Sequence, residues 1–206
     1  MNKKGLLTRA GVGATGALLL VGGAGAAVAD EVTGEDVEVS VEIEALEPVG
    51  ALTMSVAADS TSLTEVDSGD PEIRQFDGAL PTVTVTDDRE EVPDGSYWYV
   101  TGQSSAFTAD GVPEIGAEHL GWRPLLLTEG NGEVAEGEEV LTVLDEGPDA
   151  VGLVAEELLA LAIDATEAHP VGEWEANADL FLKTPVDVAP GSYSATITLT
   201  LWEDGA

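Results

Sequence analysis

Hydrophobic and polar residues alternate along much of this chain with a period of two residues. In segments 37–43 and 52–56, an aliphatic residue or methionine at every second position is separated from the next by a polar residue. Segment 82–86 (Thr-Val-Thr-Val-Thr) repeats the pattern and places Val83 and Val85 on one face. Because successive side chains of a β-strand point to opposite faces, this alternation predicts strands with one buried face and one solvated face.

The rest of the chain contains further runs of the same kind. We predict strands at 96–105, at 119–127 around Trp122, and over a short stretch at 138–144. Two final strands each place five apolar residues on one face: Trp174, Ala176, Ala178, Leu180 and Leu182 in the first, and Tyr193, Ala195, Ile197, Leu199 and Leu201 in the second. The Pro-Asp-Gly and Asn-Gly sequences between the runs are typical of turns.

Two segments are less regular. Segment 59–71 is rich in serine, aspartate and glycine, which predicts a loop. Segment 151–168 contains alanine, leucine and glutamate, which favour a helix, yet Leu159, Leu161 and Ile163 also alternate as in a strand. We expect a short helical turn at 154–158, followed by a strand.

Several short strands separated by turns predict an all-β protein, an antiparallel β-sandwich of immunoglobulin-like type. We find neither an internal repeat nor a linker long enough to separate two domains. The sandwich is therefore expected to form a single domain over residues 30–206, after a segment at 1–29 that has a different character.

The first 29 residues predict a secretory signal peptide. Three cationic residues precede an apolar stretch at 10–21, and Ala27-Val28-Ala29 supplies the small-x-small pattern that signal peptidase recognises. The apolar stretch is shorter than the roughly 20 residues that span a membrane. We therefore expect cleavage between Ala29 and Asp30 and a secreted mature protein, extracellular or at the cell surface, with no segment inserted in the membrane.

The charge of the chain is strongly negative. Its 206 residues include 40 aspartates and glutamates but 7 lysines and arginines, so the net charge is −33, and loss of the three cations in residues 1–29 would make it −36. Nucleic acids and anionic lipids are bound through cationic side chains, which argues against either as a partner. The chain has no cysteine, which excludes disulfides and thiolate metal sites.

Candidate chemistry is sparse. His119 and His169 belong to no recognisable catalytic motif, so we expect no catalytic residues. Two acidic loops offer oxygen ligands for Ca²⁺, although solvated turns have the same composition: Asp67, Asp70 and Glu72 in one, and Asp145, Glu146 and Asp149 in the other. We therefore expect no metal site, with calcium as the open alternative.

The four tryptophans are expected to differ in exposure. Trp98, Trp122 and Trp174 are best explained as core residues, because aromatic rings bury large areas. Trp202 lies on the polar face of the last predicted strand and should be the most exposed of the four. An exposed indole can stack on a sugar ring.

Several segments resemble the WxL-domain proteins of Gram-positive cell surfaces. The likeness extends over about residues 46–202, and its elements are Pro81–Arg89, Ser96–Gly102, Ser104–Phe107, Ile115–Glu118 and Pro190–Leu201. The family is named for two Trp-x-Leu motifs. In this chain Trp98-Tyr99-Val100 corresponds to the first, with valine in place of leucine, and Leu199-Thr200-Leu201, followed by Trp202, stands at the second.

The resemblance implies a secreted β-sandwich that is held non-covalently on peptidoglycan, often within a multiprotein surface complex. It also implies that the residues of the two motifs take part in binding: Trp98, Tyr99, Val100, Leu199, Leu201 and Trp202. We therefore expect a non-catalytic cell-surface module that binds the cell wall or other surface proteins. A structural or adhesion subunit of a secreted complex and a small secreted glycoside hydrolase remain the alternatives.

Overall fold

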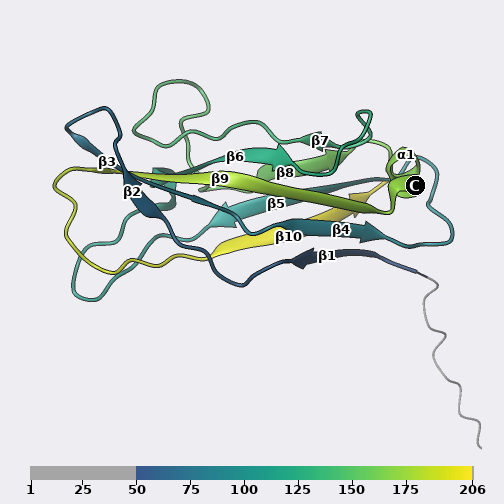
Figure 1. The fold of residues 1–206 in the computed structure, drawn as a ribbon, viewed down its shortest axis with the longest axis horizontal. Coiled ribbons are helices and arrows are strands. Elements are labelled where there is room, and N and C mark those ends of the chain that lie inside the picture. Colours follow the sequence, from purple (N-terminus) through teal and green to yellow (C-terminus); the bar gives the residue numbers. More distant parts are fainter. Residues whose placement is uncertain (1–49, 206) are drawn as a thin grey trace, which may run out of the picture. The chain divides into compact units, whose positions relative to one another are not determined.

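Two antiparallel sheets lie in layers in the computed structural model, which describes residues 50–205 of the chain (Figure 1). The predicted signal peptide and the predicted strand at 37–43 lie outside the described residues. The described residues all belong to one compact unit, Leu46–Ala206. The prediction of an all-β, antiparallel sandwich is confirmed.

The larger sheet has six strands arranged about one long central strand. Its members are β1 (Leu52–Val56), β2 (Thr64–Val66), β3 (Ile73–Ala79), β4 (Val83–Asp87), β6 (Leu120–Leu126) and β9 (Glu173–Pro185). β9 pairs with β6 along one side and with both β4 and β3 along the other. β1 and β2 then pair with β4 and β3, respectively.

β3 and β4 follow each other along the same side of β9, separated by an irregular step. Ala79 pairs with Asp179 and Val83 with Ala176, so three residues on one side face two residues of β9 on the other. Pro81, which has no N–H to donate to a ladder, lies at this step. The Leu80 N–H still donates to the Ala178 carbonyl at 2.8 Å. This β-bulge lets two short strands share one long partner.

The smaller sheet has four strands in the order β10, β5, β8, β7. Their bounds are β5 (Tyr97–Ser104), β7 (Ala135–Glu136), β8 (Glu157–Ala162) and β10 (Ile197–Asp204). β10 pairs with β5 over its whole length and is an edge strand among the described residues. A break in the register at Val100/Thr101 separates two parts of the ladder between β5 and β8.

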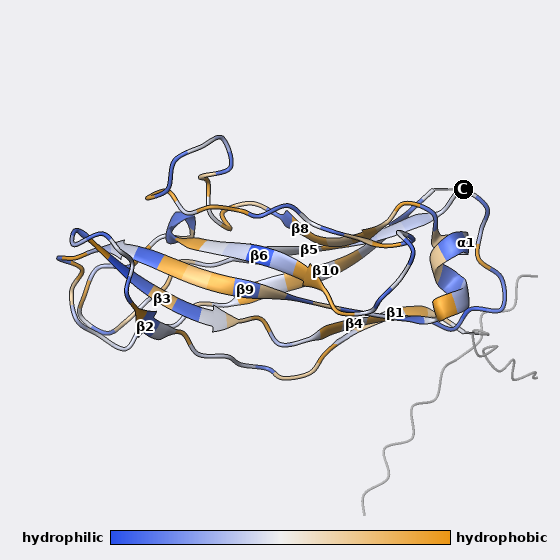
Figure 2. Ribbon diagram, turned by 45° about the horizontal axis from the view of Figure 1, so that its top comes forward, coloured by the Kyte–Doolittle hydropathy of each residue, from blue (hydrophilic) through white to orange (hydrophobic). Residues whose placement is uncertain are grey.

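The hydrophobic core lies between the two sheets. Trp98 from β5, Trp122 from β6 and Trp174 from β9 are buried, as are Val83 and Val85, which confirms the predicted core faces. Apolar residues recur along β4 and β9 in Figure 2. The sheets approach closely at Gly102, where a Cβ atom would lie 2.6 Å from Cη2 of Trp122.

Four predictions of secondary structure were wrong. Segment 138–144 does not form a strand. It contains two isolated bridges, between Val140 and Trp122 and between Leu141 and Ala150. The helical turn expected at 154–158 is absent, since β8 begins at Glu157. The expected loop at 59–71 contains β2. In the last predicted strand, residues 193–196 form a single bridge, between Thr108 and Ser194, before β10 begins.

The helices are short. α1 (Ala165–Ala168) begins after Asp164, whose Oδ1 accepts from the Thr166 N–H at 2.9 Å and caps the helix. Single 3₁₀ turns, η1 (Ala117–His119) and η2 (His169–Val171), complete the helical elements of residues 50–205. In this part of the chain, no helix has the length and apolar character required to cross a membrane.

Candidate functional site

The outer face of β5 and β10 carries three aromatic side chains in a row, which we call the aromatic strip: Tyr97, Tyr99 and Trp202. Side chains alternate along both strands, so Trp98 and Val100 are buried while the tyrosines on either side of Trp98 are half-buried. The register of the ladder places Trp202 directly opposite Tyr99. Neighbouring strands thus bring together rings that are about one hundred residues apart in sequence.

The three rings are mutually ordered. The ring centroids of Tyr97 and Tyr99 are 6.2 Å apart with planes inclined by 17°, and those of Tyr99 and Trp202 are 6.3 Å apart with planes inclined by 19°. Trp202 is 39% exposed, whereas the other three tryptophans are buried, so the predicted difference among them is confirmed. Ordered aromatic rings with one end in water are typical of surfaces that bind a partner.

Hydrogen bonds hold the polar atoms at both ends of the strip. The Trp202 Nε1–H donates to Thr101 Oγ1 at 2.9 Å, which orients the indole toward the outward residue of β5 that follows Tyr99 on the same face. At the other end, the Tyr97 hydroxyl donates to Asp204 Oδ2 at 3.2 Å. This hydrogen bond and the negative charge of Asp204 raise the pKa of Tyr97, so its hydroxyl stays protonated.

The surroundings of the strip are almost uncharged. Gln103, Thr198 and Thr200 continue the same outer face, and Asp204 alone carries a charge among the outward residues of the two strands. This is unusual on a chain with 40 acidic residues. The face therefore offers apolar rings and neutral hydrogen-bonding groups, which suits a neutral polar ligand better than an ion.

The structure separates the six residues predicted to bind. Tyr99 and Trp202 lie together on the strip. Trp98 and Val100 point into the core, and Leu199 and Leu201 are packed against it, so none of these four lies on the strip. Tyr97 was not predicted, although its spacing of two residues from Tyr99 is the signal that could have identified it. The predicted cleavage site at Ala29 and Asp30 lies outside the described residues.

Carboxylates of both acidic loops are engaged in contacts within the protein. Asp67 Oδ1 accepts from the Gly69 N–H at 3.0 Å, and Asp70 Oδ1 accepts from the Glu72 N–H at 2.8 Å, so both carboxylates stabilise turns. In the second loop, Asp145 hydrogen-bonds Thr142 and pairs with Lys183. Within residues 50–205, no group of three or more His, Cys, Asp or Glu is placed to hold a metal ion.

The histidines have structural surroundings. His119 Nδ1 lies 2.7 Å from the Lys183 carbonyl oxygen, and His169 Nδ1 lies 3.6 Å from Asp87 Oδ1. Neither histidine hydrogen-bonds a serine hydroxyl in the described part of the chain. Burial, reinforced by the charge of Asp149, raises the pKa of Glu157.

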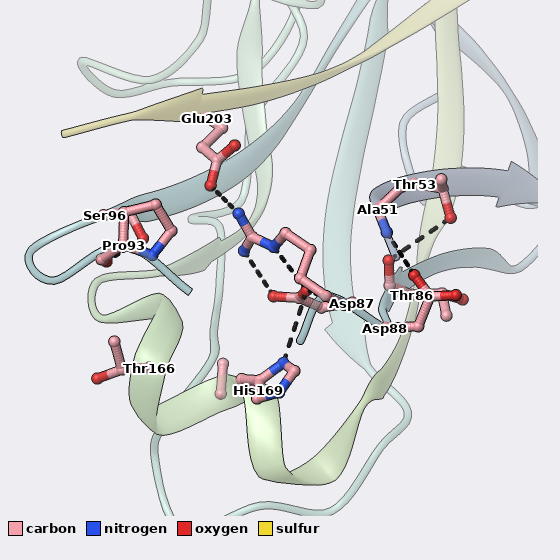
Figure 3. A network of polar contacts seen from close by, with 12 residues as sticks. Ala51, Thr53, Thr86, Asp87, Asp88, Pro93, Ser96, Thr166, His169 and Glu203 are labelled. Atoms are coloured by element: carbon pink, nitrogen blue, oxygen red, sulfur yellow. Dashed lines mark hydrogen bonds and ion pairs between the residues drawn. The ribbon is translucent and has the colours of Figure 1, made fainter. Parts of the chain in front are cut away.

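A second polar cluster, which we call the clamp, consists of Asp87, Arg89 and Glu203. Arg89 donates from Nε to Asp87 Oδ1 at 2.7 Å and from a terminal nitrogen to Oδ2 at 2.6 Å, and its other terminal nitrogen pairs with Glu203. Figure 3 shows the carboxylates of Asp87 and Glu203 at the guanidinium and His169 beside Asp87. Since Asp87 ends β4 and Glu203 belongs to β10, the clamp joins the two sheets.

The charges of the clamp stabilise one another although Asp87 is buried. Asp87 is only 5% exposed, and burial alone would raise its pKa. The hydrogen bonds and charge of Arg89 outweigh burial and leave the pKa of Asp87 below its usual value. In turn, the hydrogen bonds to Asp87 and Glu203 raise the pKa of Arg89. Charges held in this way serve the fold and are not free to act on a substrate.

We found no family model that matches this chain, and no match among curated proteins or solved structures. The resemblance to WxL-domain proteins therefore stays a prediction from the sequence segments alone.

Proposed function

We propose that this protein is a secreted, non-catalytic surface module that binds the glycan of a cell wall through the aromatic strip. The observation that carries the proposal is the exposed indole of Trp202, aligned with Tyr99 and Tyr97 on a sheet face whose outward residues include a single charge, that of Asp204. The predicted signal peptide and the resemblance to WxL-domain proteins support the same location and role.

The chemistry of the strip favours carbohydrate over other ligands. Sugar rings present apolar C–H groups, which pack against aromatic rings, and hydroxyls, which need hydrogen-bonding partners. Thr198, Thr200 and Gln103 provide such groups beside the rings. A neutral glycan also avoids the repulsion that anionic wall polymers would meet on a mature protein whose expected net charge is −36.

Other surface proteins are the second partner class that this proposal includes. A sheet face with exposed aromatic residues also suits a protein interface, because tyrosine and tryptophan are enriched at such surfaces. In that case, the module would act as a subunit of a secreted assembly. Competition by soluble glycan fragments distinguishes the two partners, since it would displace a wall ligand but not a protein ligand.

The test is sedimentation of the mature protein with purified peptidoglycan sacculi. We expect Trp202→Ala to weaken binding at least tenfold and Trp202→Phe, which keeps an aromatic ring, to weaken it less. Val186→Ala, a change at an exposed apolar residue outside the strip, is the matched control and should bind as the parent does. Equal binding by all four proteins would refute the role of the strip.

A further inference from the structure

A second candidate site is a cavity of about 930 Å³ between the two sheets. It reaches solvent between segments 56–63 and 188–197, whose lining residues are exposed or half-buried. Ligand pockets typically measure about 300–1,000 Å³, so the cavity is large enough for a small molecule. It does not include any residue of the aromatic strip.

The cavity is mainly apolar. It is lined by Met54 of β1, Leu63 just before β2 and Phe76 of β3, and by Ile197 and Leu199 of β10. The residues of β9 in the lining are Leu180, Leu182 and Thr184. At about 3.3 Å per residue, the four steps from Leu180 to Thr184 span roughly 13 Å along the strand. An apolar space of this length suits the hydrocarbon chain of a slender molecule.

One end of the cavity is polar. Thr184 is fully buried and lines the cavity, and its Oγ1 has no hydrogen-bond partner among residues 50–205. A buried hydroxyl without a partner is costly and is normally satisfied by water or a ligand. Arg74 lies opposite Thr184 in the ladder and also lines the cavity. A ligand oxygen at this end would satisfy the hydroxyl.

The charges around this end favour an uncharged head group. Arg74 forms a bidentate pair with Glu65, at 2.8 and 2.9 Å, and packs over the Phe76 ring. Its charge is thus already balanced, and Asp59 is the other charged residue in the lining. The field of a strongly acidic protein disfavours a carboxylate or phosphate at this position.

We propose that the cavity binds an uncharged single-chain amphiphile of the monoacylglycerol or long-chain alcohol class. The chain lies among the apolar side chains that extend from Met54 to Leu199, and the head-group oxygen hydrogen-bonds Thr184 Oγ1. A peptide strand fits less well, because it would bring a polar amide about every 3.3 Å among the apolar side chains. The polar residues of the lining, such as Ser60, Thr61 and Ser194, lie at its solvent-exposed mouth instead.

The test is displacement of N-phenyl-1-naphthylamine, an uncharged fluorescent probe, from the mature protein. We expect monolauroylglycerol to displace the probe at concentrations at least tenfold lower than dodecanoate, which has a similar chain and an anionic head. Thr184→Val should weaken displacement by monolauroylglycerol three- to tenfold, because one hydrogen bond is lost. Thr84→Val, outside the cavity, is the matched control and should not change it.

A second variant tests the location. Ala195 lines the cavity, and Ala195→Trp should fill it and abolish probe binding while circular dichroism shows that the sheet content is kept. The proposal is overturned if the probe is not bound by the parent, if Ala195→Trp binds it as the parent does, or if dodecanoate and monolauroylglycerol compete equally. Displacement by an alternating apolar peptide, without displacement by any amphiphile, also overturns it.

Discussion

The two halves of β10 lie at very different parts of the sandwich. Its C-terminal half carries Trp202 on the outside and Glu203 on the inside, where Glu203 completes the clamp to the other sheet. Its N-terminal half, with Ile197 and Leu199, lines the cavity. The C-terminal half of β10 therefore helps to close the sandwich at one end, and its N-terminal half lines the open space between the sheets at the other.

The difference shows what closes this sandwich. At the closed end, Arg89, two residues after the end of β4, reaches β10 and is held by two carboxylates. At the open end, apolar side chains face each other across the cavity, and an ion pair between Arg74 and Glu65 remains within the larger sheet. An ion pair that joins the two sheets thus marks the closed end. Within the described lining of the cavity, no ion pair joins the sheets, and the space between them is left for a ligand.

The largest expected loss of stability comes from Arg89→Ala, which removes the ion pairs of the clamp at the closed end. Because this change leaves the buried Asp87 carboxylate without its partner, we expect a loss of about 3 kcal/mol in the free energy of unfolding. Urea denaturation followed by fluorescence measures it. Arg123→Ala is the matched control: Arg123 is 56% exposed and pairs with Glu139 at the surface, so its loss should cost less than about 1 kcal/mol. Equal losses would contradict the special role of the clamp.

A smaller loss of stability is expected for Gly102→Ala, midway between the two ends of the sandwich. The added methyl would lie 2.6 Å from the buried Trp122 ring, and we expect a loss of about 2 kcal/mol from overpacking. Thermal unfolding measures it. In a Trp122→Leu background, the same change should cost much less, because the smaller side chain leaves room. If the cost is the same in both backgrounds, close packing between the sheets is not the cause.

Acidification should reduce the stability that the clamp gives to the folded protein. The pKa of Asp87 is lowered in the folded protein, so its contribution to stability is present above the unfolded pKa and is lost as pH falls through the folded pKa. We expect the free energy of unfolding to fall less steeply with acidification in Asp87→Asn than in the parent. Denaturation at pH values from 6 to 2 tests this, and parallel curves would contradict it.

The sequence predicted those strands whose two faces differ in solvent exposure. β4 and β9 alternate buried and less buried residues, and both were predicted from that pattern. β3 was missed because Ile73–Phe76 and the residues that follow are nearly all half-buried, so polar and apolar residues do not alternate. The helical turn expected at 154–158 is absent because helix-favouring residues also occupy β8, where pairing with β5 overrides their intrinsic preference. α1 was not predicted.

The candidate sites depend on pairings that local sequence does not encode. The exposure of Trp202 was predicted from its side of the strand, but its stacking on Tyr99 depends on the register of β10 against β5. Likewise, Arg89 and Glu203 are 114 residues apart, and no local pattern connects them. Sequence periodicity thus identifies which face a residue occupies, whereas sheet topology decides which residues meet.

The smallest expected change in stability concerns two buried threonines that differ in hydrogen bonding. Thr184 and Thr142 are both 0% exposed, but Thr184 Oγ1 has no partner in the described residues, while Thr142 Oγ1 donates to Asp145 Oδ2 at 2.7 Å. Thr184→Val should therefore stabilise the ligand-free protein by about 1 kcal/mol, since it removes an unsatisfied polar group without changing the shape of the side chain. Thr142→Val should destabilise it by about the same amount. Chemical denaturation of both variants decides the point: a loss of stability in Thr184→Val would mean that this hydroxyl is already satisfied, so that the polar end of the cavity needs no ligand oxygen.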